Sequence, residues 1–277
     1  MNFGIKVSVI IPTFNRCEVL ARALSSVILQ GYKNLEIIVV DDGSTDLTRK
    51  LIEEKFPKVN YYYQTNKGVS SARNFAIKKS TGKYVSLLDS DDEWEKDKLQ
   101  QQVIYFQENP QAKLVHTNEK WIRNGQFVNQ MKKHRKGGGD QFIPSLELCL
   151  ISPSSVMFTR QLFDEIGGFR EDFPVCEDYD YWLKVTSRYE VGYIDNPLTV
   201  KYGGHDDQLS RTYFAMDFWR IKSIDWILKN RELSADQYLA ARETLLKKSR
   251  ILLKGYLKHQ NFTNYDEVNR LLLDWQS

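Results

Sequence analysis

A cluster of acidic residues follows one short apolar run in the first third of the chain. Asp89, Asp91 and Asp92 stand within four residues, directly after the run Tyr84–Leu88. Carboxylates this close repel one another unless a cation or hydrogen bonds neutralise them. At the end of a strand, an Asp-x-Asp pair can hold Mg²⁺ or Mn²⁺ and leave positions for the oxygens of a diphosphate. The alternative is a helix N-terminus, where the segment Ser90–Glu93 would place acids against the helix dipole.

Two further segments combine glycine with polar residues. Asp41 and Asp42 precede Gly43, and Asp-Gly is a common turn sequence. A carboxylate at a strand end can instead accept the N–H group of a planar base such as uracil. In Gly68–Asn74, a glycine and two serines open a helix whose N-terminus suits an anion. The alternative there is an ordinary capped helix with Arg73 on the surface.

Two more candidates lie in the second half of the chain. Glu177 and Asp178 open an aromatic-rich helix, where acids usually act as partners of the helix dipole. The alternative is a general base, which must lie within hydrogen-bond reach of an incoming hydroxyl. His205 follows two glycines and precedes two aspartates. Such a histidine is either structural or reaches a metal or a diphosphate.

The elements that must position these residues alternate between strand and helix. Apolar runs and helical spacing predict strands over 7–11, 35–40, 60–64 and 84–88, and helices over 19–30, 45–55 and 70–79. Repeated strand–helix units imply a mostly parallel sheet with helices on both faces and its loops on one edge. Ligands bind beyond the carboxyl ends of such strands. The two acidic motifs should therefore meet at one edge, although about fifty residues separate them.

After residue 97 the pattern becomes less regular. We expect a helix over 99–108, strands over 112–118 and 155–159, a helix starting at 160–166 and a turn at 167–169. The basic, glycine-containing segment 131–139 is typical of a flexible surface loop. From about Tyr213 onward the sequence is helical, and Ser234–Gln237 has the spacing of a capping box.

The last long helix combines a basic face with a leucine stripe. Arg242–Lys258 carries six basic residues against one acid, Glu243. An amphipathic basic helix can lie on an anionic membrane. The apolar stripe, formed by Leu245, Leu246, Leu252, Leu253, Tyr256 and Leu257, is more often core or a partner interface. We favour the core or interface interpretation, and the interface form makes a homodimer plausible.

Composition narrows the class of protein. The chain has 277 residues, a net charge of +3 and 42% hydrophobic residues, which suits one large α/β domain with an appendage. The near-neutral balance gives no general attraction to nucleic acid. Three distant cysteines without a CxxC motif fit a reducing compartment. Without a signal peptide or an apolar stretch long enough to span a bilayer, we expect a cytoplasmic protein, with peripheral contact to the inner face of a membrane as an option.

Taken in order, five segments resemble glycosyltransferase family 2. They are VSVIIPTFNR at 7–16, EIIVVDDGSTD at 36–46, NKGVSSARNFAI at 66–77, YVSLLDSDDEW at 84–94 and CEDYDYWLKV at 176–185. The resemblance covers about residues 5–212 and implies an α/β fold of the GT-A type, Rossmann-like, with a mostly parallel central sheet. It also implies a nucleotide-binding half over 1–97 and an acceptor half over 98–212. Residues 213–277 would then form a C-terminal helical region.

The resemblance implies roles for particular residues. Pro12 and Thr13 would line the base pocket, Asp42 would bind the base, Arg73 would contact the nucleotide and Asp89 would lie near the ribose. Asp91 would ligate the metal, either Mn²⁺ or Mg²⁺, and His205 matches a segment in which many members carry a histidine near the metal or diphosphate. Asp178 would be the catalytic base that deprotonates the acceptor hydroxyl.

The implied activity is inverting transfer of a sugar, as by a hexosyltransferase, from a nucleotide-diphosphate sugar to a hydroxyl. UDP is the commoner nucleotide in the family, and the acceptor would be a glycan or a lipid-linked glycan in surface polysaccharide assembly. Acceptor choice would lie in the variable half, including 132–139 and 152–155. A sugar nucleotidyltransferase is the first alternative, but Pro12–Arg16 lacks the glycine-rich basic segment which that chemistry usually needs. A non-catalytic binding protein is the second, and the presence of Asp42, Asp91 and Asp178 argues against it.

Overall fold

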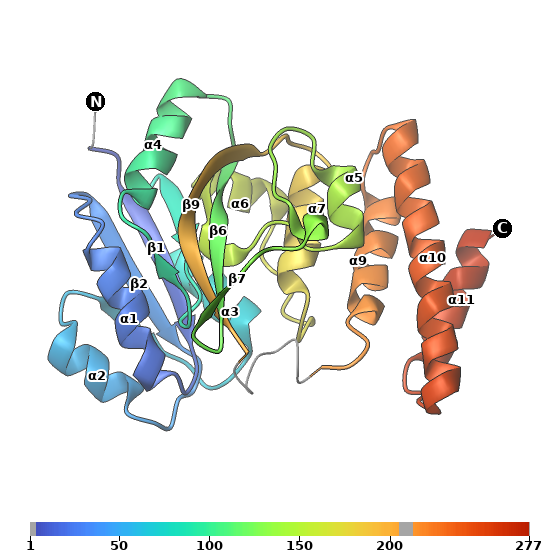
Figure 1. Cartoon of the computed structure of the whole chain (residues 1–277), viewed down its shortest axis with the longest axis horizontal. Coiled ribbons are helices and arrows are strands. Elements are labelled where there is room, and N and C mark those ends of the chain that lie inside the picture. Colours follow the sequence, from blue (N-terminus) through green and yellow to red (C-terminus); the bar gives the residue numbers. More distant parts are fainter. Residues whose placement is uncertain (1–3, 205–212, 277) are drawn as a thin grey trace.

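The computed structural model describes residues 4–204 and 213–276. A nine-stranded sheet forms its centre, with eight strands in the order β3-β2-β1-β4-β8-β6-β9-β5 and β7 paired to the outer part of β6. The first half of the sheet is parallel and contains β1 (Val7–Thr13), β2 (Leu35–Asp41), β3 (Asn60–Tyr63) and β4 (Tyr84–Leu87). Helices α1 (Cys17–Ile28), α2 (Thr48–Lys55) and α3 (Val69–Lys79) connect these strands (Figure 1). The carboxyl ends of these strands therefore share one edge, as expected.

The second half of the sheet is mixed rather than parallel. Strand β8 (Val156–Thr159) runs antiparallel to both of its neighbours, β4 and β6 (Leu114–Arg123), whereas β9 (Gly192–Gly203) runs parallel to β6. Two short strands, β5 (Glu93–Trp94) and β7 (Gln126–Val128), pair antiparallel with β9 and β6. Helices α4 (Lys98–Glu108), α5 (Phe142–Glu147), α6 (Arg160–Ile166) and α7 (Glu177–Thr186) complete this half, with 3₁₀ turns η1 (Lys132–His134) and η2 (Pro153–Ser155).

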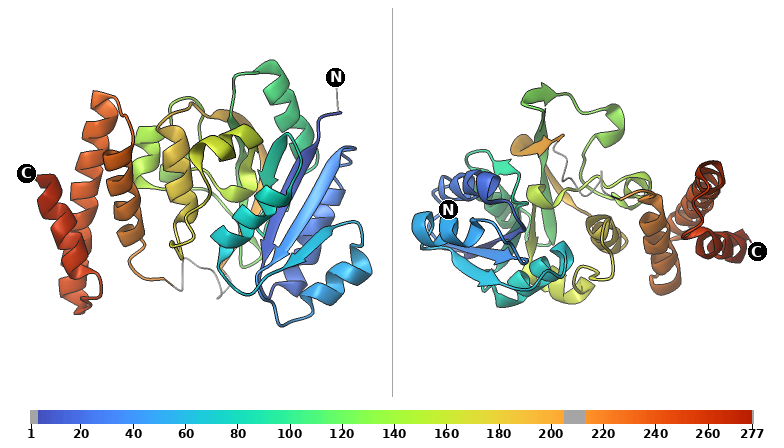
Figure 2. Two further views of the ribbon diagram at one scale, coloured as in Figure 1. Left: turned by 180° about the vertical axis from the view of Figure 1, so that it is seen from behind. Right: turned by 90° about the horizontal axis from the view of Figure 1, so that it is seen from below.

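Two hydrophobic clusters cover the two faces of the sheet. Successive side chains of a strand point to opposite faces, so Val9 and Ile10 of β1 enter different clusters. Helices α3, α6 and α7 pack on the face of Ile10, and α1, α2 and α4 pack on the face of Val9 (Figure 2). The α/β fold predicted from the sequence is confirmed.

Three helices extend the molecule beyond the sheet. They are α9 (Asp217–Asn230), α10 (Ala235–His259) and α11 (Tyr265–Gln276), and a third hydrophobic cluster joins them to α5 and α7 (Figure 1). The predicted capping box forms at the start of α10, where Ser234 and Gln237 exchange hydrogen bonds of 3.2 Å. Four residues of the predicted stripe, Leu245, Leu246, Leu253 and Tyr256, are buried in this cluster, whereas Leu257 is 54% exposed. The core interpretation of the stripe is thus confirmed for most of its length.

Some expectations differ from the structure. The predicted strand over 112–118 begins at Leu114 and continues to Arg123, and β9 was not expected at all. No helix begins at Ser90–Glu93, because that segment forms a turn leading into β5, so the N-terminal-cap alternative for the acidic cluster is wrong. Within residues 4–204 and 213–276, no helix combines the length and hydrophobicity needed to cross a bilayer. The division of the chain at residues 97 and 212 stays a prediction.

Candidate active site at the carboxyl edge of the parallel strands

Asp41 closes the turn that follows β2. One carboxylate oxygen accepts the backbone N–H of Ser44 at 2.7 Å, and the other accepts the hydroxyl of Tyr61 at 2.7 Å. Both oxygens are thus used inside the fold, and the side chain is 1% exposed. Asp41 is therefore a structural acid, and it fixes the position of the residue that follows it.

Asp42 holds the loop that leads into α3. Its Oδ1 accepts the backbone N–H of Lys67 at 2.9 Å and the amide of Gln64 at 2.6 Å, and its Oδ2 accepts the N–H of Gly68 at 2.8 Å. A carboxylate can accept about four hydrogen bonds. Three are used in this loop, so Asp42 keeps capacity for one further donor.

Thr13 ends β1 beside these two aspartates. It is paired with Asp41 in the strand register, and its carbonyl accepts the N–H of Asp42 at 2.8 Å. The Thr13 side chain is 3% exposed, and its hydroxyl has no hydrogen-bond partner within the described residues. Buried polar groups normally find a partner, so this hydroxyl is suited to a ligand. Pro12 precedes it within β1, which continues to Thr13 instead of ending at Ile11, and the place of both residues in a base pocket stays a prediction.

Arg73 lies at the centre of the candidate site. Its guanidinium donates to Asp89 at 2.7 Å and to Glu177 at 2.7 Å, and it lies 5.4 Å from the ring centroid of Phe169. The residue is 3% exposed, so the surface alternative for Arg73 is wrong. These ion pairs join α3, the turn after β4 and the start of α7. The predicted contact of Arg73 with a nucleotide stays a prediction.

The turn 89–92 is held by a serine from the other half of the sheet. Ser154 of η2 accepts the backbone N–H of Asp89 at 3.1 Å and donates to Asp92 at 2.6 Å. Asp92 also accepts the N–H of Tyr202 at 3.2 Å. Burial raises the pKa of Asp92 well above its ordinary value, against the opposing charge of Lys201. Asp92 is therefore a structural member of the cluster.

Asp89 and Asp91 are the more accessible members of that turn. Their side chains are 28% and 20% exposed, and Asp91 forms an ion pair with Arg16 at 3.0 Å. In the described part of the chain, no group of three or more His, Cys, Asp or Glu residues is placed so that it could hold a metal ion by itself. Mg²⁺ usually takes only one or two protein carboxylates and completes its shell with phosphate and water oxygens, so these two acids fit such an ion. His205 lies outside the described residues.

Asp178 occupies the first turn of α7, directly after Glu177. One carboxylate oxygen accepts the N–H of Tyr179 at 2.7 Å, and the other accepts the thiol of Cys149 at 3.4 Å. Burial and the nearby Asp178 carboxylate raise the pKa of Cys149 well above its ordinary value, so the thiol remains a donor. Asp178 is half-buried, which leaves part of its carboxylate accessible. With this geometry, Asp178 can act either as a partner of the helix dipole or as a general base.

A buried charge network that the sequence motifs did not indicate lies beside the site. Glu119 of β6 pairs with Lys136 at 3.2 Å and accepts the hydroxyl of Ser152. Burial alone would raise the pKa of Glu119, but Lys136 and Lys201 outweigh it and lower that pKa to about 2. The ammonium of Lys201 on β9 is also within electrostatic reach of Asp89, Asp92 and Asp178. The short run Leu198–Val200 before Lys201 is typical of a strand, but nothing in it indicates the pairing with β6.

Comparison with known proteins identifies related sequences. The sequence profile described as Glycosyl transferase family 2 matches residues 8–167. An uncharacterized glycosyltransferase of Rickettsia felis is 36% identical over 197 residues, which cover 70% of this chain and 32% of that protein. The chain thus spans about a third of the length of the first curated relatives. A glucosyltransferase of Escherichia coli, named for UDP-Glc and α-D-GlcNAc-diphosphoundecaprenol, is 31% identical over 193 residues, covering 68% of this chain and 73% of that protein.

Solved structures show the same fold at low sequence identity. S. aureus TarS 1–349 in complex with UDP-GlcNAc superposes with a TM-score of 0.66 at 20% identity, covering 96% of this chain and 91% of that chain. The mannosyltransferase PcManGT of Pyrobaculum calidifontis, in complex with GDP-Man and Mn²⁺, gives a TM-score of 0.60 at 18% identity. That match covers 98% of this chain and 84% of the other. Both carry the fold that the sequence motifs imply.

Proposed function

The chain belongs to glycosyl transferase family 2, and on that premise we propose that it is an inverting glycosyltransferase. It would move a hexose from a nucleotide-diphosphate sugar, UDP-linked, to a hydroxyl of a glycan or lipid-linked acceptor. Residues 1–97 would bind the nucleotide and residues 98–212 the acceptor. The observation that carries the proposal is that Arg73 forms two ion pairs, one with Asp89 and one with Glu177. Asp89 lies at the edge proposed for the nucleotide, and Glu177 is the neighbour of Asp178, so Arg73 connects the two parts of the site.

The nucleotide would bind where β1 and β2 end. The unpartnered hydroxyl of Thr13 and the remaining acceptor capacity of Asp42 suit the polar edge of a base, with Pro12 beside it. Asp89 would lie near the ribose, and Arg73 would contact the nucleotide through the part of its guanidinium not used by the carboxylates. A UDP donor is favoured because the S. aureus structure contains UDP-GlcNAc and the E. coli relative is named for UDP-Glc.

A divalent cation is part of the proposal because one neighbour in the same fold contains Mn²⁺ with GDP-Man. Asp91 would hold it, with His205 as a second proposed ligand. When bound, Mn²⁺ or Mg²⁺ would neutralise the diphosphate and stabilise the departing nucleoside diphosphate. Before a ligand binds, Arg16 neutralises the Asp91 carboxylate, which limits repulsion within the acidic turn.

Asp178 would act as the general base in a direct displacement. The acceptor oxygen forms its bond to the anomeric carbon while the bond from that carbon to the diphosphate oxygen breaks, and Asp178 takes the proton of the attacking hydroxyl. Cys149 donates to one carboxylate oxygen and the N–H of Tyr179 to the other, and a carboxylate accepts about four hydrogen bonds, so the acceptor hydroxyl can still bind. No covalent intermediate with the enzyme is needed, so the configuration at the anomeric carbon is inverted.

The acceptor, location and assembly are proposed from less direct observations. The E. coli relative is named for a diphosphoundecaprenol-linked acceptor, which supports a lipid-linked acceptor, surface polysaccharide assembly and a cytoplasmic site at the inner membrane face.

Of the six basic residues of Arg242–Lys258, Lys247 pairs with Glu147 and Lys248 is buried, so membrane contact by α10 would rest on the other four. A homodimer contact would use Ile251 and Leu257, each more than half exposed.

Calorimetric titration tests the donor site first. UDP, GDP and dTDP would be titrated with and without Mn²⁺ into the wild type and Asp91→Ala. Asp164→Ala is the matched control, because Asp164 is an exposed aspartate of α6 on the nucleotide-distal part of the fold. We expect metal-dependent binding of UDP that Asp91→Ala loses and Asp164→Ala keeps.

The outcomes of that titration separate the parts of the proposal. Binding of GDP or dTDP in place of UDP would keep the transferase and correct the donor. Equal binding with and without Mn²⁺ would remove the metal from the proposal. Absence of binding by all three nucleotides would contradict the donor site itself.

A further inference from the structure

The segment 121–139 combines exposed apolar side chains with several basic residues. It contains five Lys or Arg residues and no Asp or Glu. Phe127 is 66% exposed, Met131 58% and Val128 37%, although large apolar side chains are normally covered. We call these three, together with the exposed cations Arg123, Lys132, Lys133 and Arg135, the hairpin surface. It is carried by the last residue of β6, by β7 and by the segment after β7, and β7 pairs only with β6 in the described sheet.

Contacts with β6 anchor the segment that carries the hairpin surface. The amide of Gln130 donates to the carbonyl of Glu119 at 2.8 Å, and Lys136 pairs with the Glu119 carboxylate at 3.2 Å. The side chains of this ion pair are 4% and 1% exposed. The ring of His134 lies 5.1 Å from that of Trp121. Because both ends of the segment are anchored, the exposure of Phe127 and Met131 is a property of the fold.

The anchored end of this segment, at Lys136, lies next to the acceptor side of the candidate site. Lys136 donates to the carbonyl of Leu150 at 2.7 Å, and the neighbouring Cys149 contacts Asp178. Glu119, which forms the ion pair with Lys136, also accepts a hydrogen bond from the hydroxyl of Ser152. A short chain of contacts through Lys136, Leu150 and Cys149 thus connects the segment with Asp178, the proposed general base.

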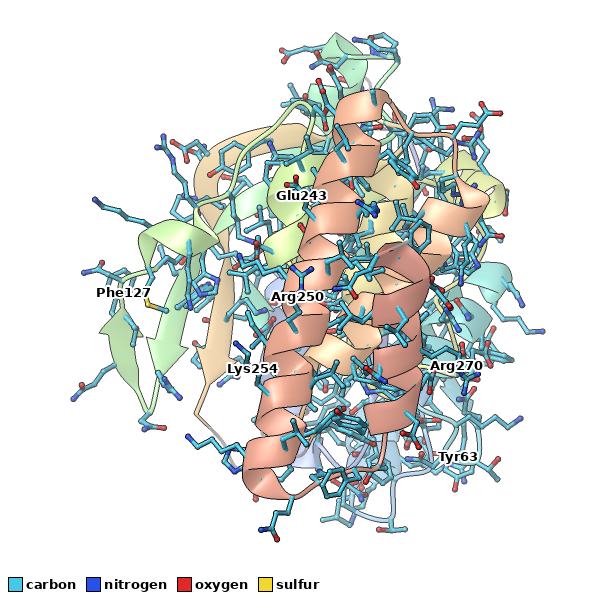
Figure 3. The ribbon with its side chains drawn as sticks, turned by 90° about the vertical axis from the view of Figure 1, so that its right-hand side faces the viewer. Tyr63, Phe127, Glu243, Arg250, Lys254 and Arg270 are labelled. Carbon is cyan, nitrogen blue, oxygen red and sulfur yellow. The ribbon has the colours of Figure 1, made fainter. Side chains whose placement is uncertain are left out.

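The positive charge of the hairpin surface indicates what kind of partner it can bind. In the described residues, none of its four exposed cations forms an ion pair, so all four present their charge to solvent. An anionic bilayer offers phosphate groups to such cations and an apolar boundary to side chains such as Phe127. Figure 3 shows Phe127 projecting at one margin of the molecule, and Lys254 on the edge of α10 that faces the same side. The basic side chains of α10 can therefore extend the surface but do not replace its apolar part.

We propose that the hairpin surface docks the protein on an anionic membrane, with Phe127 and Met131 at the acyl boundary and Lys132 and Lys133 on the phosphate groups. This orientation presents a lipid-linked hydroxyl to the Asp178 side of the site, a consequence that rests on the proposed function. Membrane binding itself does not rest on it. A protein partner is the competing occupant, and it would give no binding to pure lipid.

Sedimentation with vesicles tests the proposal on the full chain. The vesicles contain phosphatidylcholine alone or phosphatidylcholine with phosphatidylglycerol, at low and high salt. We expect binding to the anionic vesicles only, weakened by salt because the attraction is screened. Each basic residue near an anionic surface contributes about fivefold, so Lys132→Ser/Lys133→Ser should weaken partitioning about 25-fold. Phe127→Ser/Met131→Ser should remove the fraction of binding that survives high salt.

A matched charge control separates this surface from α10. Arg250→Ser/Lys254→Ser removes the same two charges from exposed positions and should weaken partitioning by less than about fivefold. An equal loss in both charge variants would overturn the proposal, as would absence of wild-type binding to anionic vesicles. All variants change exposed residues, and their melting temperatures would confirm folding. UDP titration of the same variants should be unchanged, so failure of the donor site and failure of membrane docking are distinguishable.

Discussion

Arg73 donates a 2.7 Å hydrogen bond to Glu177, a residue 104 positions later in the chain. The bond connects α3, whose start is held by Asp42, with the first turn of α7, which carries Asp178. Because the same guanidinium also binds Asp89, one buried cation fixes the proposed donor and acceptor sides relative to each other. A mutation of Arg73 should therefore affect both stability and the geometry of the site.

Arg73→Ala should destabilise the protein strongly. The substitution leaves the buried Glu177 and the partly buried Asp89 without their cation, and breaking a buried ion pair costs about 3–5 kcal/mol. Chemical unfolding would measure the loss. Arg49→Ala is the control, because Arg49 forms an exposed pair with Glu53 at 3.5 Å and its loss should cost less than about 1 kcal/mol. Equal, small losses in both variants would mean that the Arg73 cluster contributes little to folding.

Thr13→Val should lower nucleotide affinity without lowering stability. The Thr13 hydroxyl is buried and has no partner within the described residues, so removing it costs the folded protein no hydrogen bond. If a nucleotide supplies the missing partner, the variant loses about 1 kcal/mol of binding, or about fivefold in affinity. Titration with UDP and Mn²⁺ would measure this. Ser249→Ala, which removes another buried unpartnered hydroxyl in α10, should leave affinity unchanged.

The nucleotide side of the fold was predictable because local pattern and tertiary structure agree there. Strands β1, β2 and β4 contain short apolar runs followed by Pro12, Asp41 and Asp89, and each observed boundary lies within two residues of the expected one. Placing the acidic motifs after these strands was enough to bring Asp42 and Asp89 to one edge. The capping box of α10 was readable for the same reason, since its signal lies within four residues.

The acceptor side was harder to predict because its elements depend on distant partners. Strand β9 contains Asp195, Asn196 and Pro197, which are typical of a turn, and its register with β6 shifts at that point. The ion pair of Glu119 and Lys136 joins a strand to a segment that composition assigns to the surface. Neither pairing leaves a local signal, so this part of the site needed the structure.

The stability of the protein should fall as the pH drops from about 6.5 toward 4. Burial, assisted by Lys136, lowers the pKa of His116 to about 4. In that window the unfolded chain takes up a proton on His116 and the folded chain does not, so acid favours unfolding. The free energy of unfolding should change by up to about 1.4 kcal/mol per pH unit from this group.

Unfolding curves of variants would assign that dependence to His116. His116→Gln keeps an amide that can donate to the Gly137 carbonyl, as His116 Nε2 does at 2.8 Å, and it removes the titration. Its stability should therefore be flatter between pH 6.5 and 5. His259→Gln, at an exposed position near the end of α10, should keep the wild-type slope. A wild-type slope in His116→Gln would show that other groups cause the acid sensitivity.

Asp178→Asn should abolish transfer while leaving donor binding intact. An amide cannot take the proton of the acceptor hydroxyl, and loss of a general base lowers kcat by about 10²–10⁴-fold. The asparagine still fits the first turn of α7 and can still accept the Cys149 thiol, so UDP affinity should stay within about twofold. Asp172→Asn, at an exposed aspartate that pairs with Arg170, is the control and should keep full activity. Undiminished kcat in Asp178→Asn would place the base elsewhere, whereas loss of UDP binding would make Asp178 part of the donor site.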